Sequence, residues 1–153
     1  TNKWLCIRYF YWYGLLFFRF KKKVNNIIIK LNSKPAWVIK INTNNAVYDF
    51  NLADLKTDSV VIKSQILKLN LKTSSVQPLS VFDIKSGLTS ISISIPNKSD
   101  CILYSDYILP ALNYDFLTKI NSKSYKTFDF DNSLYKSSFF FNSALTKLEL
   151  INN

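Results

Sequence analysis

Hydrophobic and polar residues alternate through the middle of the chain, in short stretches separated by turn-forming residues. The clearest stretches are residues 67–72, where leucine alternates with lysine and asparagine, and residues 90–95, where isoleucine alternates with serine. Alternation with a period of two places each apolar set on one face of a strand. Weaker stretches of the same kind lie at residues 24–31, 36–41 and 46–52. The pattern therefore predicts a series of half-buried strands.

The last third of the chain shows helical spacing in two places. One helix is expected within residues 142–150, where Leu145 and Leu148 fall on one side, and another is expected around Leu109, Leu112, Phe116 and Ile120. No internal repeat is expected. The sequence thus predicts an α+β fold, with a mostly antiparallel sheet, about two C-terminal helices and a basic aromatic N-terminal arm.

Charge is distributed unevenly along the 153 residues. Residues 1–48 carry nine basic side chains and no acid, whereas residues 49–153 carry eleven lysines, nine aspartates and one glutamate. A/T-rich codons favour lysine, but they would act on both parts equally, so the contrast indicates selection for a basic N-terminal third. Together with a hydrophobic content of 48%, this predicts a basic aromatic arm or anchor at residues 1–23 and a single domain at residues 24–153.

The residue types that most catalytic motifs require are scarce. The chain has no histidine and only two glycines, which excludes serine–histidine and cysteine–histidine catalysis and glycine-rich phosphate loops. Cys6 and Cys101 are too few for a four-ligand zinc site, so we expect two buried free thiols. Asp129 and Asp131 have the spacing of a cation-binding pair on a strand, although solvation or pairing with lysine is the simpler reading. We expect no enzymatic activity, no metal and no cofactor.

Residues 4–20 form the most apolar segment and are followed by three lysines. A membrane-spanning helix needs about 20 apolar residues, and here Arg8 and Arg19 interrupt a segment of 17. A full span would require both arginines to snorkel. Three readings stay open: an aromatic segment of the core, a membrane-interface helix, or an RNA-binding extension.

The RNA-binding reading rests on the mixture of cations, which pair with phosphates, and aromatic rings, which stack on unpaired bases. The predicted phosphate-binding residues are Arg8, Arg19, Lys21, Lys22, Lys23, Lys30, Lys34 and Lys40, and the predicted stacking residues are Tyr9, Tyr11, Trp12 and Tyr13.

In its Lys-, Asn-, Ile- and Phe-rich composition and the +9 charge of residues 1–46, the chain resembles ribosomal proteins encoded in A/T-rich mitochondrial genomes. The resemblance implies a structural constituent of the mitochondrial ribosome, located in the matrix, with ribosomal RNA and neighbouring ribosomal proteins as partners. Mitochondrion-encoded respiratory-chain subunits share this composition. The alternative is therefore an accessory subunit of an inner-membrane respiratory complex, in which residues 4–20 form a short membrane or interfacial helix against lipid and other subunits.

Overall fold

The computed structural model describes residues 31, 33–109, 112 and 114–152, and of residues 8–10 and 15–19 it describes the strand pairing. This part of the chain contains ten strands and no helix. The strands are β1 (Arg8–Phe10), β2 (Leu15–Arg19), β3 (Trp37–Asn42), β4 (Asn45–Asn51), β5 (Thr57–Lys72), β6 (Leu79–Ile95), β7 (Ser99–Ser105), β8 (Leu117–Asn121), β9 (Ser124–Thr127) and β10 (Tyr135–Asn152). The expected strands at residues 36–41, 46–52, 67–72 and 90–95 are confirmed, while residues 24–30 lie outside the described residues.

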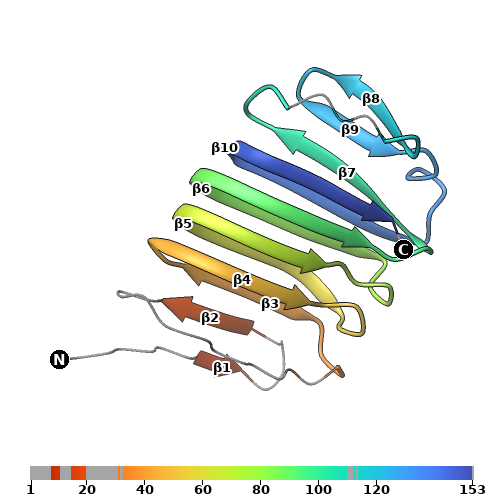
Figure 1. Cartoon of the computed structure of the whole chain (residues 1–153). Coiled ribbons are helices and arrows are strands. Elements are labelled where there is room, and N and C mark those ends of the chain that lie inside the picture. The colour runs from red at the N-terminus through yellow and green to blue at the C-terminus, as the bar shows by residue number, and fades with distance from the viewer. Residues whose placement is uncertain are drawn as a thin grey trace.

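The chain winds as a flattened solenoid with two layers (Figure 1). Strand β5 pairs with β3 up to Lys63 and with β4 from Ile66 onward, so it passes from one layer to the other at a bend between these residues. Strands β6 and β10 bend in the same way beside it. The bends stack along one long edge, which we call the bend edge. The connections after β4, β5 and β6 stack along the opposite edge, which we call the turn edge.

Parallel pairing dominates the solenoid, so the expected mostly antiparallel sheet is wrong. The pairs β2–β3, β3–β5, β4–β5, β5–β6, β6–β10 and β10–β7 are parallel, and the antiparallel pairs among the described strands are β1–β2, β7–β9 and β8–β9. The connections between β3 and β6 join strands in opposite layers, so β3 pairs with β5, and β5 pairs with β6, one turn later.

The solenoid contains a repeat, contrary to expectation. Ile41 pairs with Ile62, and Ile62 pairs with Ile84, at offsets of 21 and 22 residues. The tripeptide Ile-Lys-Ser recurs at residues 62–64 and 84–86, immediately before two bends. The Ser64 hydroxyl donates to the carbonyl of Asn44 (2.7 Å), and the Ser86 hydroxyl donates to that of Leu88 (2.9 Å). These serines therefore satisfy carbonyls at the bends, where the strand ladder is interrupted.

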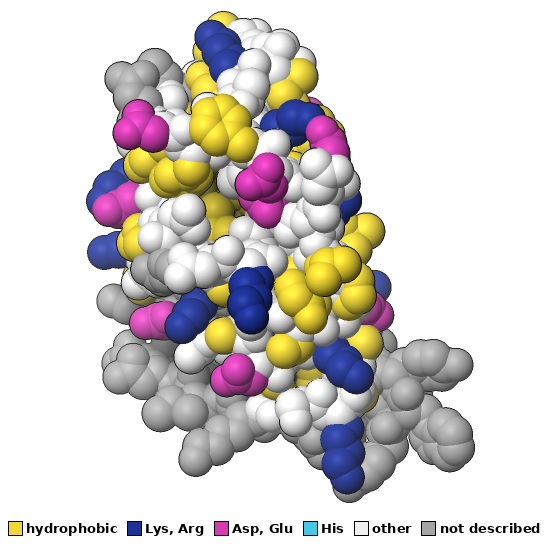
Figure 2. Space-filling model, turned by 90° about the vertical axis from the view of Figure 1, so that its right-hand side faces the viewer, with side chains coloured by type: hydrophobic (Ala, Val, Ile, Leu, Met, Phe, Trp, Pro, Cys, Tyr) yellow, Lys and Arg dark blue, Asp and Glu magenta, His cyan; other side chains and the backbone are white. Residues whose placement is uncertain are grey.

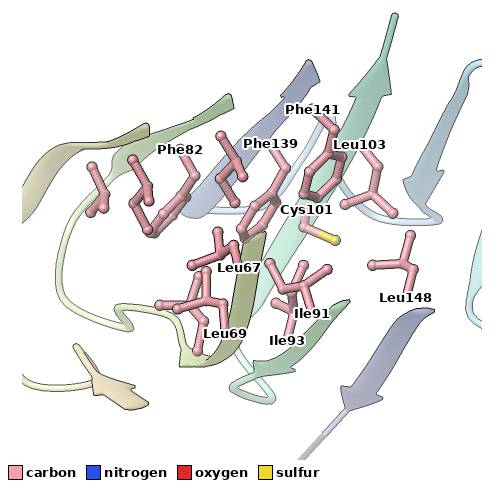
Figure 3. Close-up of a cluster of buried hydrophobic side chains, with 14 of the residues drawn as sticks. Leu67, Leu69, Phe82, Ile91, Ile93, Cys101, Leu103, Phe139, Phe141 and Leu148 are labelled. Carbon is pink, nitrogen blue, oxygen red and sulfur yellow. The ribbon is translucent and has the colours of Figure 1, made fainter. Parts of the chain in front are cut away.

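Apolar side chains from the two layers meet between them (Figure 3). Phe82 of β6 stacks on Phe139 of β10 with ring centroids 4.6 Å apart, and Phe139 stacks on Phe141 at 6.1 Å. Leu69 and Ile91 of the second layer close the core from the other side. All five side chains are at most 1% exposed. Burial of such side chains contributes about 1.5–3 kcal/mol each, which makes this interlayer core the main stabilising element.

The two expected C-terminal helices are wrong. Residues 142–150 belong to β10, whose pairing with β6 shifts between Asn142 and Ala144 and again between Leu145 and Lys147. The first shift places an extra residue in β6, and the second places one in β10, as a β-bulge does. Because of this second bulge, Leu145 and Leu148 share a face at a spacing of three that imitates a helix. Of the four residues expected on the other helix, Leu109, Leu112 and Phe116 pack against the core from described positions that are not helical, and Ile120 lies in β8.

The last strand of the chain lies inside the sheet. Strand β10 fills the position between β6 and β7, pairing in parallel with β6 over its whole length and with β7 over residues 135–141. Strands β9 and β8 follow β7 and cap that end. Strands β6 and β7 are consecutive in the chain but become neighbours of β10 and not of each other. The sheet is therefore continuous from β6 to β7 only when β10 is in place.

Gly87 sits at the bend of β6, where a side chain has no room. A Cβ atom there would lie 2.8 Å from the carbonyl oxygen of Gln65. We expect Gly87→Ala to destabilise the protein by about 1–3 kcal/mol through forced backbone movement. The stabilisation of about 0.4–1 kcal/mol that alanine gives by restricting the unfolded chain is smaller.

The urea concentration at the midpoint of unfolding measures the net loss of stability in Gly87→Ala. Ser90→Ala, on the half-buried outer face of the same strand, is the control and should shift stability by less than about 0.5 kcal/mol. Equal stability of Gly87→Ala and the unaltered chain would contradict the close approach.

Candidate nucleic-acid interface

The predicted cationic residues of the N-terminal third lie in line with lysines of the solenoid. Arg19 pairs with Asn42 of β3, Asn42 pairs with Lys63 of β5, and Lys63 pairs with Lys85 of β6. Because directly paired residues of neighbouring strands share a face, Asn42, Lys63 and Lys85 form one row on the outer face of the first layer. The basic region therefore continues from β3 onto β5 and β6, beyond the part of the chain in which the sequence located it.

A second row runs parallel to the first. Arg8 pairs with Phe17, Phe17 pairs with Lys40, and Lys40 pairs with Val61. Lys40 is exposed and therefore accessible from solvent. Both predicted arginines of the N-terminal segment thus have backbone positions in line with this outer face, which we call the basic face and define by Lys40, Lys63 and Lys85.

The other predicted site residues divide into two groups. Lys34 is exposed in the bend before β3, and Tyr9 belongs to β1. The remaining residues lie outside the described part of the chain; these are Lys21, Lys22, Lys23, Lys30, Tyr11, Trp12 and Tyr13. RNA binding by these seven residues stays a prediction.

An exposed aromatic pair occupies the same row as Lys40. The row continues from Val61 to Asp83 of β6, Phe140 of β10 and Tyr104 of β7. The rings of Phe140 and Tyr104 stack with centroids 5.2 Å apart and planes 13° from parallel, and they are 43% and 39% exposed. Large aromatic side chains usually lie in the core, so a stacked pair at the surface is a candidate contact for a flat ligand.

A shallow hollow of about 270 Å³ adjoins this aromatic pair. Its lining includes Phe140, Tyr104, Asp106 and the ion pair between Lys85 and Asp83, whose Nζ and carboxylate oxygen are 3.0 Å apart. The sequence analysis missed the aromatic pair because Tyr104 and Phe140 are 36 residues apart in the sequence. The signal that could have found them is alternation: each follows a buried residue, so each points outward.

The described residues offer little for catalysis. Cys101 is a buried free thiol, as expected, and burial, with a smaller contribution from Asp100, raises its pKa to about 12. It is therefore a poor nucleophile near neutral pH. Asp129 and Asp131 do not lie on a strand, because residues 128–132 form turns. The Asp131 carboxylate accepts a hydrogen bond from Lys126, which lowers its pKa, and pairing with lysine is the simpler reading that the sequence offered. Within the described ranges, no group of three potential metal ligands occurs.

The fold and surface define a parallel β-solenoid of two layers that carries cations and an exposed aromatic pair on one outer face. A comparison with protein-family models, curated proteins and solved structures found no match. Among the described residues, no helix has the length and hydrophobicity needed to cross a membrane.

Proposed function

We propose that this chain is a non-catalytic structural protein that binds RNA through the basic face and the N-terminal third, and that the RNA is ribosomal RNA of a mitochondrion. The observation that carries the proposal is the shared row of Lys40, Phe140 and Tyr104. Three strand intervals of about 4.8 Å separate Lys40 from Phe140, which is about 14 Å. One strand of RNA lying across the sheet would meet the cations first and the rings next.

Each part of the face has its own role in binding. Lys40 and Lys63 contribute phosphate contacts, and such contacts fix position without reading sequence. Phe140 and Tyr104 offer ring surfaces for unpaired bases, whose stacking is worth about 1–3 kcal/mol per base. Lys63 and Lys85 lie directly opposite each other, and Lys85 pairs with Asp83 at 3.0 Å. Lys40 and Lys63 are therefore the lysines of the basic face to which we assign the phosphate contacts.

The alternative of a membrane-complex subunit draws support from the apolar residues 4–20 and the lysines that follow them. It requires a helix over that segment, whereas Arg8–Phe10 and Leu15–Arg19 are strands, and β2 pairs with β3. Strand pairing agrees better with the reading in which this segment joins the sheet. RNA binding is for this reason the function we favour.

The test is the affinity of the purified full chain for a uridine oligonucleotide, measured by fluorescence anisotropy at several salt concentrations. We expect Lys40→Glu/Lys63→Glu to weaken binding and to reduce the slope of log affinity against log salt by at least about 1.4, because each phosphate contact on a single strand contributes about 0.7.

The matched control is Lys56→Glu/Lys98→Glu, which makes the same charge change at two exposed lysines of the turn edge. It should lower the slope much less, since these lysines lie away from the basic face. Equal loss in both double variants would mean that RNA responds only to net charge, and the proposed face would be wrong.

A further inference from the structure

Exposed apolar side chains line the bend edge, on a different surface from the basic face. Ile66 of β5 and Leu88 of β6 pair directly and are 51% and 46% exposed. Val47 of β4 is 72% exposed. It lies diagonally across from Ile66, since Ile66 pairs with Asn45, two residues before Val47 on the same strand. Three consecutive strands thus present apolar side chains at or just after the position where the chain changes layers.

The same edge continues across β10 to the end of the solenoid. The Asp106 amide donates to the Phe141 carbonyl at the bend of β10 (3.0 Å), and Leu109 donates to Ser122 in the β8–β9 turn (3.1 Å). These bonds hold the intervening Tyr107 and Ile108 at the bend edge, 55% and 76% exposed. Ile120, in the last part of β8, is 48% exposed beside them. We call the whole set the apolar ridge: Val47, Ile66, Leu88, Tyr107, Ile108 and Ile120.

The shape of the apolar ridge restricts its partner. It follows the margin where the strands turn from one layer into the other (Figure 1), and its six side chains are 46% to 76% exposed. A helical peptide needs a groove to cover its apolar face. A row of exposed apolar side chains suits the interface of a bilayer, where such groups enter between lipid headgroups.

Charge distinguishes the two long edges. Lysines outside the basic face accompany the apolar ridge beyond the bends and at the β8–β9 turn; they are Lys68, Lys119, Lys123 and Lys147. Two acidic side chains lie among them: Asp106 is next to Tyr107, and Glu149 pairs with Lys147 at 2.8 Å. Six of the nine aspartates lie at the opposite, turn edge: Asp54, Asp58, Asp100, Asp115, Asp129 and Asp131. Figure 2 shows that edge, where acidic side chains are spread among lysines and scattered apolar residues.

We infer that the apolar ridge is a contact surface for a bilayer that contains anionic phospholipids. Its apolar side chains would enter the headgroup region while the flanking lysines meet lipid phosphates. A second copy of the same edge is a poor partner, because a two-fold contact would bring each set of lysines against its equivalent. This inference is independent of RNA binding, since none of the six ridge residues belongs to the basic face.

The experiment is co-sedimentation of the full chain with vesicles of phosphatidylcholine and phosphatidylglycerol, and with vesicles of phosphatidylcholine alone. We expect Ile66→Ser/Leu88→Ser to lower the partition coefficient on anionic vesicles about tenfold or more. The matched control is Val76→Ser/Leu134→Ser, which removes two exposed apolar side chains, 40% and 79% exposed, from the turn edge. The control should bind anionic vesicles as strongly as the unaltered chain does. Both variants retain residues 4–20, so any contribution of that segment to vesicle binding is the same in each.

Tyr107→Ser/Ile108→Ser provides a second test outside the strands and should give a similar loss, even if the first variant folds poorly. Uridine oligonucleotide affinity should stay unchanged in both ridge variants, which separates this inference from the RNA proposal. Equal vesicle binding by Tyr107→Ser/Ile108→Ser and the unaltered chain, or equal binding to neutral and anionic vesicles, would overturn it.

Discussion

A chain that ends at Ser133, and therefore lacks β10, is expected to remain unfolded. Strand β10 separates β6 from β7 and supplies the buried side chains Phe139, Phe141, Leu148 and Leu150 to the interlayer core. Its loss removes apolar burial worth several kcal/mol, at about 1.5–3 kcal/mol for each such side chain. Domains of this size have a total stability of only about 5–15 kcal/mol. Far-ultraviolet circular dichroism during heating should show no cooperative transition.

A synthetic peptide of residues 134–152 provides the control for this truncation. Because β10 pairs along both edges over its first half, the peptide should bind the truncated chain and restore the cooperative transition. A cooperative transition in the truncated chain without the peptide would contradict the central position of β10.

The second large effect is expected from Phe139→Ala. Phe139 is fully buried and lies between the rings of Phe82 and Phe141. Truncation of a buried phenylalanine costs about 3–5 kcal/mol, because the transfer free energy is lost and a cavity remains. The free energy of unfolding in urea measures this loss.

The neighbouring Phe140→Ala is a matched control with the same change in side chain. Phe140 is 43% exposed and stacks on Tyr104 at the surface, so its loss should cost about 1 kcal/mol, the scale of one aromatic pair. Similar losses at the two positions would show that β10 does not present alternate residues to core and solvent as described.

The sequence predicts the individual strands of this fold better than it predicts their order in the sheet. Alternation in residues 67–72 and 90–95 correctly identified strands, because a two-layer sheet buries one face of each strand. Alternation contains no information about which strand lies beside which. The parallel order depends on the bends, and there the sequence signal is weak: Ile-Lys-Ser precedes two bends, but Asn142 and Ser143 occupy the equivalent place in β10.

The candidate site was partly predictable for a similar reason. Lys40 belongs to the basic third that charge counting identifies, and its exposure agrees with that reading. Lys63 lies in the nearly neutral remainder of the chain, and only the register of β3 with β5 brings it beside Asn42. The aromatic pair of Tyr104 and Phe140 depends on the insertion of β10 beside β7, a long-range pairing that no local pattern reports.

The most direct test of the proposed function is sedimentation of the protein from a lysate of its source, with nuclease and non-ionic detergent applied separately. If the protein is a structural part of a ribosome, it should sediment with ribosomal particles in detergent and be released by nuclease. Binding of the apolar ridge to lipid would not alter this result, because detergent removes the bilayer. Release by detergent, with sedimentation unaffected by nuclease, would contradict RNA binding as the basis of its attachment.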